Sequence, residues 1–245
     1  MFNADLFDKI YEDDAILVVN KYVGVVVNTS STTTNTTIQE VVGEVVDDDT
    51  ESEFALRSGI VHRIDKETSG ILLIAKTKSA FDKIQNQFKA RSVAKKYSAL
   101  VFGKITDPIL EINAPIGRDP KNRLRFAVVA EGKESSTTIN LLSTHVIDGT
   151  ILSLINAFPK TGRTHQIRVH MSALNHPIVG DGIYSNKSQK AFADRFFNRM
   201  MLHAGSIEFT HPVTGARVFF ETPLPKEFLD VYNIESNAQE DCPKN

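Results

Sequence analysis

A short polar segment, residues 62–70, leads directly into an apolar run and carries the residues best placed for chemistry. Its letters are H-R-I-D-K-E-T-S-G, and I-L-L-I-A follows at 71–75. An unbroken apolar run of this length predicts a strand covered on both faces. Asp65 then lies in a loop at the start of a rigid strand, where its carboxylate could face solvent and substrate. The alternative is a solvated turn in which Asp65 caps a backbone amide, as loop aspartates commonly do.

Several other chemistries lack their usual residues. The chain has no phosphate-binding glycine loop, no H-E-x-x-H pair and no G-x-S-x-G nucleophile turn. His165 and His170 are five residues apart, which does not place both on one helix face. Cys242 is the only cysteine, so an intrachain disulfide and a multi-cysteine metal site are excluded. A structural role for most of the histidines is therefore expected, rather than metal ligation.

Composition predicts a folded protein with an uneven distribution of charge. The 245 residues are 41% hydrophobic, enough for one large domain or two small ones. The net charge is −2. Nevertheless residues 1–57 carry 3 basic and 12 acidic residues, whereas residues 58–225 carry 23 basic and 13 acidic ones. This basic middle could track phosphates, or its charges could be spread over a solvated surface.

The chain shows no feature that directs it to a membrane or out of the cell. No apolar run approaches the roughly 18–20 residues that span a bilayer. The first residues, M-F-N-A-D, do not form a basic region followed by an apolar stretch, so no secretory signal is predicted. Together with the lone cysteine, this favours a cytoplasmic setting. Nothing indicates a coiled coil, and we expect a monomer.

Hydrophobic periodicity predicts a mixture of strands and helices. A helix is expected over 79–91, capped by Ser79, with Phe81, Ile84 and Phe88 at helical spacing. Low-complexity and acidic residues make 28–53 a polar, mobile segment, apart from a helical turn or two near 38–46, and 234–245 reads as a polar tail. Strands are expected at 15–19, 24–27, 71–75, 96–102 and 151–158, and a hairpin at 201–209 and 216–221.

A second helix is predicted over residues 163–174, with Thr164 as its cap. Ile167, His170, Met171 and Leu174 recur at the spacing of one buried face. Arg168 lies beside that face and could reach toward a cleft. Because strands and helices mix without regular alternation, the pattern favours an α+β fold with a mostly antiparallel sheet.

Three longer motifs, met in order along the chain, resemble the RluA-type pseudouridine synthases. The segment 62–70 is similar to the family signature H-R-L-D-x-x-T-S-G. Residues 95–100, K-K-Y-S-A-L, resemble K-x-Y-x-A-L, and residues 161–170, T-G-R-T-H-Q-I-R-V-H, resemble T-G-R-T-H-Q-[LI]-R-V-H. Shorter matches at 176–181 and 202–204, and a weaker one ending at Lys21, extend the resemblance from about residue 14 to 229.

The resemblance implies one catalytic domain with a central RNA-binding cleft, and isomerisation of uridine to pseudouridine without cofactor or metal. It places the catalytic carboxylate at Asp65, acting as a nucleophile or as a base. Arg168 would be the ion-pair partner of Asp65, and Tyr97 would stack on the target base. Arg63 would contact the displaced nucleotide, or else pair with Glu67 at the surface. Ile167 is assigned to substrate contact by its matching position.

The resemblance also bounds the partners. RNA is the expected partner, with ribosomal RNA favoured over transfer RNA, and no separate N-terminal RNA-binding domain is expected. A basic cluster at Arg118, Lys121, Arg123 and Arg125 could hold RNA phosphates or form an ordinary solvated hairpin. Two other functions stay open: a non-catalytic RNA-binding or ribosome-assembly module, and a carboxylate-dependent glycosidase with Glu67 as second acid.

Overall fold

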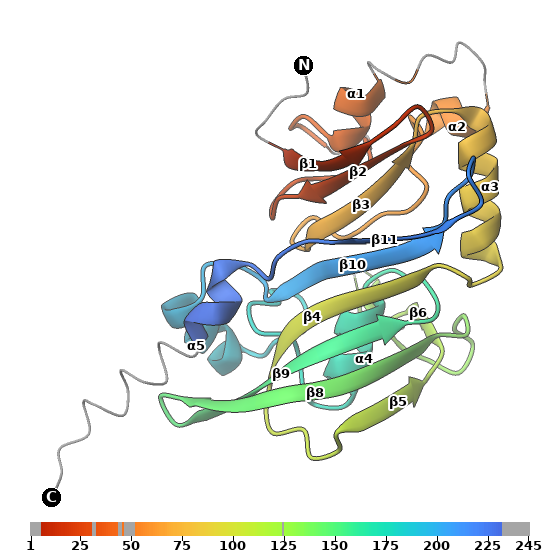
Figure 1. Cartoon of the computed structure of the whole chain (residues 1–245). Helices are drawn as coiled ribbons and strands as arrows, with labels where there is room; N and C mark the ends of the chain where they lie inside the picture. The colour runs from red at the N-terminus through yellow and green to blue at the C-terminus, as the bar shows by residue number, and fades with distance from the viewer. Residues whose placement is uncertain (1–5, 31–32, 44–45, 47–51, 124, 232–245) are drawn as a thin grey trace, which may run out of the picture. The chain divides into compact units, whose positions relative to one another are not determined.

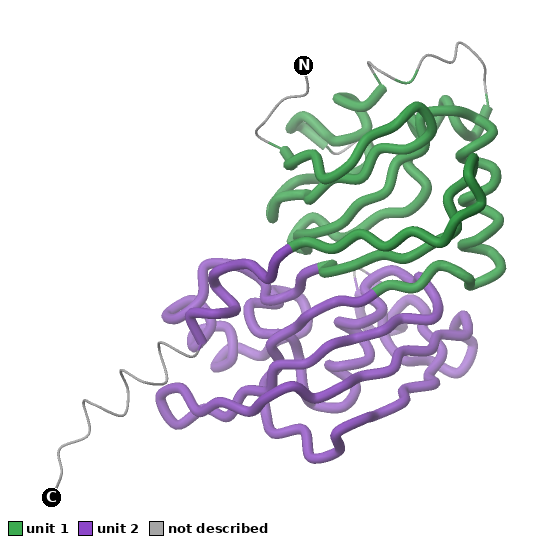
Figure 2. The backbone as a smooth tube through the Cα atoms, in the orientation of Figure 1, with its two compact units in different colours: residues 1–95, 204–222 green, residues 96–203, 223–245 purple. Residues whose placement is uncertain are grey.

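A computed structural model describes residues 6–30, 33–43, 46, 52–123 and 125–231 of the chain. They form two compact units, coloured separately in Figure 2. Unit 1 contains residues 1–95 and 204–222, and unit 2 contains residues 96–203 and 223–245. The expectation of one domain over 1–245 stays a prediction, and the expected polar tail at 234–245 lies outside the described residues.

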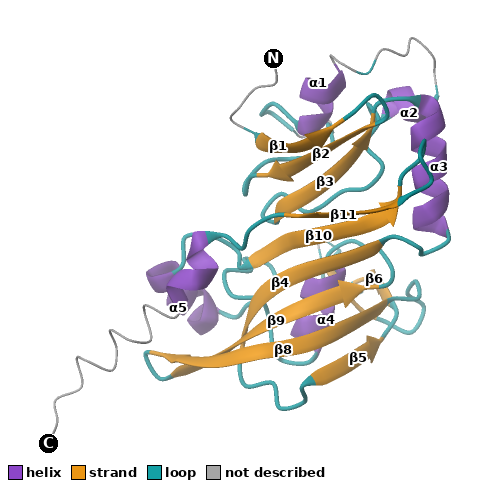
Figure 3. Ribbon diagram, in the orientation of Figure 1, coloured by secondary structure: helices purple, strands orange, loops and turns teal. Residues whose placement is uncertain are grey.

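Unit 1 is a sheet with helices at its side (Figures 1 and 3). The sheet order is β1-β2-β3-β10, and β11 pairs with β10. The β1–β2, β2–β3 and β10–β11 pairs are antiparallel. The strands are β1 (Phe7–Glu12), β2 (Ile16–Lys21), β3 (Ser69–Ala75), β10 (Leu202–Thr210) and β11 (Arg217–Glu221), and the helices are α1 (Ile38–Gly43), α2 (Glu53–Leu56) and α3 (Lys78–Lys89).

The apolar run after the polar segment forms β3, in which every residue is buried. Helix α3 packs its apolar stripe on this part of the sheet, where Phe81 and Ile84 are fully enclosed. The helix begins earlier than predicted, because the hydroxyl of Thr77, rather than that of Ser79, accepts the hydrogen bond of the Ala80 amide. The predicted strand at 71–75 is confirmed, and the helix predicted over 79–91 is present but ends at Lys89.

Residues 24–27 are not a strand, contrary to prediction. The chain turns here, and the carbonyls of Val26 and Val27 accept hydrogen bonds from the amides of Ile38 and Gln39. These bonds join the turn to the start of α1. Helix α1 lies within 28–53 but is ordered, because Thr37 and Glu40 cap it reciprocally and its apolar side chains are buried.

Unit 2 contains a second set of antiparallel strands in the order β4-β9-β8-β5, and a separate β6–β7 hairpin. Its helices are α4, which packs on β9 and β7, and α5. A core of aliphatic side chains and phenylalanines lies between α4, α5 and the strands. The bounds are β4 (Ala94–Phe102), β5 (Ile109–Asn113), β6 (Ile116–Arg118), β7 (Phe126–Val128), β8 (Ser136–Ile147), β9 (Thr150–Pro159), α4 (Gln166–Ala173) and α5 (Lys187–Phe196).

The helix predicted over 163–174 is shorter, and its cap is different. It starts at Gln166, and the preceding His165 has a left-handed backbone with φ of 56° and no side-chain cap. Ile167, His170 and Met171 are buried as predicted, but Leu174 lies past the helix end and is 37% exposed. The strands at 15–19, 96–102 and 151–158 and the C-terminal hairpin are confirmed. The mixed, mostly antiparallel arrangement confirms the predicted α+β class.

Candidate active site

Asp65 sits in the loop that leads into β3 of unit 1, as the sequence predicted. Its side chain is half-buried, and the Arg63 side chain is exposed. The amide of Thr68 donates a hydrogen bond of 3.0 Å to the Asp65 carbonyl, which closes a tight turn directly after the carboxylate. Ile64 and Thr68 are buried on either side. A partly exposed carboxylate is thus carried on backbone that is anchored at both ends.

Lys21 ties this turn to the end of β2. Its ammonium donates to three backbone carbonyls, those of Tyr22 at 2.8 Å, Val25 at 2.9 Å and Lys66 at 3.0 Å. The side chain is 0% exposed. The amide of Gly24 also donates to the Lys66 carbonyl, at 2.9 Å. The residue after Asp65 is therefore fixed by a buried charge-assisted hydrogen bond and by a backbone bond.

His62 anchors the other side of the loop. Its Nε2 atom accepts a 3.0 Å hydrogen bond from the Leu73 amide, and its ring packs on Phe88. Burial, assisted by the charge of Lys95, lowers the pKa of His62 to about 3. The ring is therefore neutral at physiological pH, with its proton on Nδ1. Burial also lowers the pKa of Lys95 to about 8.

Gly70 has a packing reason to be glycine. Its φ is 111°, and a Cβ placed there would lie 2.3 Å from the Ala204 carbonyl oxygen on β10. A side chain would therefore separate the backbones of β3 and β10. The glycine at the end of the 62–70 segment allows the strand that follows Asp65 to approach its neighbour closely.

Arg168 lies on α4 in unit 2 and is held by a carboxylate to which the sequence assigned no role. Its Nε donates to Asp181 Oδ2 at 2.7 Å and its Nη2 to Asp181 Oδ1 at 2.9 Å. Arg168 is 4% exposed and Asp181 is 1% exposed. Asp181 Oδ1 also accepts hydrogen bonds from the Ile183 and Tyr184 amides. The bidentate ion pair with Asp181 fixes the plane of the Arg168 guanidinium.

The polar residues around Arg168 organise the loop before α4. The side-chain amide of Gln166 bonds to both sides of this loop. Its Oε1 accepts hydrogen bonds from the Thr161 hydroxyl and the Arg163 backbone amide. Its Nε2 donates to the Ser136 carbonyl and the Thr137 hydroxyl. Much of the 161–170 motif is thus structural, with its side chains directed into hydrogen bonds of unit 2.

Tyr97 and Ile167 belong to the same hydrophobic cluster of unit 2. Ile167 is buried within it, and Tyr97, on β4 opposite Ala157 of β9, is half-buried at its margin. Asp65 and Arg63 lie in unit 1, whereas Tyr97, Ile167 and Arg168 lie in unit 2. That all five serve one cleft stays a prediction.

The basic cluster at 118–125 is carried by the β6–β7 hairpin. The Arg118 guanidinium lies 4.4 Å from the centre of the Phe126 ring, and its Nη1 donates to the Arg123 carbonyl at 3.0 Å. Arg125 lies over the Tyr184 ring at 5.1 Å. Among the described residues, none of the four basic side chains forms an ion pair with a carboxylate.

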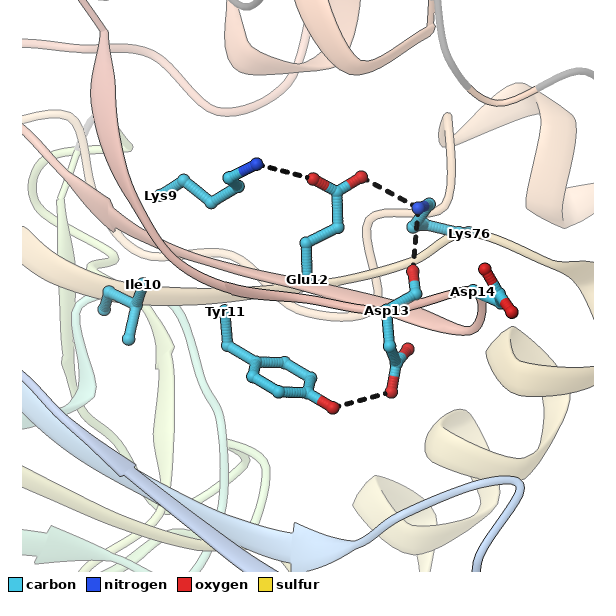
Figure 4. A pocket seen from close by; sticks show the side chains of 7 residues that line it. All are labelled: Lys9, Ile10, Tyr11, Glu12, Asp13, Asp14 and Lys76. Carbon is cyan, nitrogen blue, oxygen red and sulfur yellow. Dashed lines mark hydrogen bonds and ion pairs between the residues drawn. The ribbon is translucent and has the colours of Figure 1, made fainter.

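A surface pocket in unit 1 contains none of the predicted site residues (Figure 4). Seven residues of the β1–β2 hairpin region line it. Glu12 pairs with both Lys76 and Lys9, and these ion pairs lower its pKa. Both lysines of the pocket are thus engaged by Glu12, as in a structural surface network.

No metal or membrane element is found in the part of the chain that the structure describes. Within these ranges, no three His, Cys, Asp or Glu side chains gather as metal ligands. In the same ranges, none of the helices is both long and apolar enough to cross a bilayer.

Comparison with known proteins identifies the family. The model of the RNA pseudouridylate synthase family matches residues 15–173, which include the three long motifs. A Bacillus subtilis (strain 168) protein described as "Uncharacterized RNA pseudouridine synthase YlyB" is 38% identical over 94% of this chain and 74% of its own length. "Ribosomal large subunit pseudouridine synthase D" of Neisseria meningitidis (serogroup A) is 39% identical over 94% of this chain and 60% of its own length.

A solved structure supports the same conclusion. Human RNA pseudouridylate synthase domain containing 1 superposes with a TM-score of 0.71 at 29% identity, covering 99% of this chain and 98% of that one. The RluA-type resemblance, the α+β fold and the isomerase class of enzyme are thereby confirmed at the level of the family. The chain belongs to the RNA pseudouridylate synthase family.

Proposed function

We propose that this chain converts uridine to pseudouridine in large-subunit ribosomal RNA, with Asp65 as the catalytic carboxylate. The observation that carries the proposal is the mounting of Asp65: a partly exposed carboxylate on a loop held by Lys21, His62 and the Thr68 turn, in a chain that the family model matches. These contacts fix the turn that carries the carboxylate, and orientation is what either role, nucleophile or base, requires.

The reaction is an isomerisation whose atoms balance without a co-reactant. The bond between N1 of uracil and C1′ of ribose breaks, the base turns, and C5 bonds to C1′. The proton displaced from C5 is lost and N1 gains one. Asp65 acts either as the nucleophile that holds C1′ or as the base that opens a glycal route. Both routes need the carboxylate fixed beside the sugar.

The remaining assignments follow the matched motifs. Arg168 pairs with Asp65 and orients it, and the buried Asp181 pair supports this role because it fixes the guanidinium plane. Tyr97 stacks on the uracil, Ile167 contributes substrate contact through its place in the same cluster, and Arg63 contacts the displaced nucleotide. The exposed position of Arg63 is compatible with contact to RNA.

Large-subunit ribosomal RNA is favoured because the Neisseria relative and several others bear that name. Transfer RNA is the alternative substrate. The chain spans 60% of the Neisseria relative's length and 74% of the Bacillus relative's, so the activity of the whole relatives is extended to this chain as part of the proposal. The proposal also includes that the protein acts as a monomer in the cytoplasm.

The test is pseudouridine formation by Asp65→Asn on an unmodified large-subunit ribosomal RNA transcript and on a transfer RNA pool. We expect the wild-type protein to modify the ribosomal transcript. The variant should form no pseudouridine, yet bind the RNA with an affinity within about twofold and melt at the wild-type temperature. Continued turnover by the variant would remove Asp65 from the reaction. RNA binding without turnover by the wild-type protein would favour the non-catalytic module.

A further inference from the structure

Tyr184 connects three features of unit 2 that the proposed function treats separately. Its amide donates to Asp181, the partner of Arg168. Its ring lies under the Arg168 guanidinium at 5.3 Å and under that of Arg125 at 5.1 Å. It is only 8% exposed, so these contacts are made in the interior of the unit.

The Tyr184 hydroxyl joins the β6–β7 hairpin to the start of α4. It accepts a 3.2 Å hydrogen bond from the Phe126 amide on β7, and it lies 3.0 Å from His165 Nδ1. Burial raises the pKa of Tyr184, so the hydroxyl keeps its proton. Because the Phe126 amide can only donate, the hydroxyl proton is free to point toward His165, whose Nδ1 then accepts it.

His165 links the Tyr184 hydroxyl to the helix that carries Arg168. It stands directly before α4 with a left-handed backbone, and Arg168 follows three residues later on the same helix. A left-handed backbone at a residue other than glycine costs free energy and persists where the surroundings hold it. The Phe126 and Tyr184 rings both meet the His165 ring edge-on, at 5.8 Å.

The hairpin on the far side of Tyr184 presents basic side chains to solvent. Arg118, Lys121 and Arg123 are exposed, and the stacking of Arg118 on Phe126 uses the face of its guanidinium. Its N–H groups lie in the plane of the group, where they can contact phosphate oxygens. RNA bound by this hairpin would therefore influence the position of Phe126, which contacts both Tyr184 and His165.

We propose that Tyr184 is a positioning residue that couples RNA held by the β6–β7 hairpin to the placement of Arg168. The inference rests on the proposed function, since Arg168 acts there on Asp65. Binding of the RNA backbone at the hairpin would then increase the rate of the chemical step as well as the affinity. A displacement of about 1 Å at such a group can change a rate by one to two orders of magnitude.

The experiment measures single-turnover pseudouridine formation at saturating RNA transcript, together with the dissociation constant and its salt dependence. Tyr184→Phe keeps the ring under both arginines and removes only the hydroxyl. We expect its saturated rate to fall about tenfold, with an RNA affinity within about twofold of wild type. Tyr11→Phe, which removes a tyrosine hydroxyl bonded to Asp13 in unit 1, is the matched control and should keep the wild-type rate.

A second variant distinguishes coupling from loss of packing. Arg123→Ala should weaken RNA binding both in the wild-type protein and in the Tyr184→Phe variant. It should reduce the slope of log K against log salt concentration by about 0.7–0.9. Lys190→Ala, which removes an exposed lysine of α5, should leave the slope unchanged. Arg123→Ala alone should lower the saturated rate. Added to Tyr184→Phe, it should cause no further fall in that rate.

The inference is overturned if Tyr184→Phe keeps the wild-type saturated rate. It is also overturned if Arg123→Ala lowers that rate by the same factor in the wild-type protein and in the Tyr184→Phe variant. If Tyr184→Phe does not fold, His165→Asn carries the same test, because asparagine tolerates the left-handed backbone but lacks the ring. A wild-type protein that forms no pseudouridine, while still binding the transcript, overturns the proposed function and this inference with it.

Discussion

Arg168 and Asp181 form a buried pair that holds the guanidinium of the proposed orienting arginine in one plane. Both side chains are almost fully enclosed, and Asp181 receives two further backbone hydrogen bonds. Removing one partner of such a pair leaves an uncompensated charge in the interior, which is far more costly than breaking a surface pair. The arginine is thus placed by its partner rather than by its position in the helix alone.

We therefore expect Asp181→Asn to lower the free energy of unfolding by about 3–5 kcal/mol, measured by urea denaturation at pH 7. The matched control is Asp148→Asn, which breaks an exposed pair with Arg195 of similar length. That variant should change stability by less than about 1 kcal/mol. Equal effects of the two substitutions would show that burial does not govern the Arg168–Asp181 pair.

Lys21 is the second residue whose effect comes from burial. Methionine at this position would keep much of the side-chain volume but remove the Lys21 ammonium from the Tyr22, Val25 and Lys66 carbonyls. The Lys66 carbonyl would keep its bond from the Gly24 amide. We expect Lys21→Met to cost about 3 kcal/mol, since each buried unsatisfied group costs about 1–3 kcal/mol. Pseudouridine formation should also fall, because the turn after Asp65 loosens.

Lys9→Met is the control for Lys21→Met, because Lys9 is an exposed lysine on the neighbouring strand that forms a surface ion pair with Glu12. It should change stability by less than about 0.5 kcal/mol. If Lys21→Met unfolds no earlier than Lys9→Met in a urea titration, the three carbonyl contacts contribute nothing to the fold.

At the scale of elements, β3 and β10 approach one another at Gly70. The backbone there has a positive φ, and a Cβ would overlap the Ala204 carbonyl. We expect Gly70→Ala to destabilise the protein by at least about 2 kcal/mol, from backbone strain and from separation of the two strands. Differential scanning calorimetry should show a lower melting temperature.

Gly162→Ala tests whether the effect belongs to the site rather than to the loss of a glycine. No atom lies within 4 Å of a Cβ built at Gly162. This variant should melt within a few degrees of wild type. A Gly70→Ala protein that is as stable as Gly162→Ala would mean that β3 and β10 can move apart without cost.

The helices show how far local sequence rules reach. The stripe Phe81, Ile84 and Phe88 predicts α3 correctly, because one buried face at helical spacing is a local property. The caps are less predictable, since Thr77 and Ser79 are both competent by residue type and the helix uses the first. In the same way, Thr164 is an acceptable cap by type, yet the chain reaches α4 through a left-handed His165.

At the scale of the whole molecule, histidines whose pKa is lowered in the fold contribute to how stability depends on pH. The folded protein lowers the pKa of His62 to about 3 and that of His203 to about 4, mainly through burial. An unfolded chain takes up these protons near the ordinary value of about 6.5. Between pH 6.5 and 4 the unfolded state therefore binds more protons, and stability falls as the pH falls.

The corresponding prediction is a change of slope. Each such histidine contributes at most about 1.4 kcal/mol per pH unit in this range. In His62→Gln the amide oxygen can still accept from Leu73, but the side chain no longer titrates. We expect the slope of unfolding free energy against pH to be smaller in this variant than in wild type by up to that amount. Parallel slopes in urea titrations from pH 6.5 to 4 would contradict the neutral state of His62.

The amino-acid sequence is enough to predict the family, most strands and helices, and the position of Asp65 at the start of a buried strand. These are properties of local periodicity and of motifs that are read along the chain. Asp181, Lys21 and Tyr184 acquire their roles only in the tertiary structure, because each acts on groups that are distant in sequence or on a turn whose shape no local pattern fixes. A buried charge needs a partner wherever the fold supplies one, and only the folded chain shows that Arg168 finds it in Asp181.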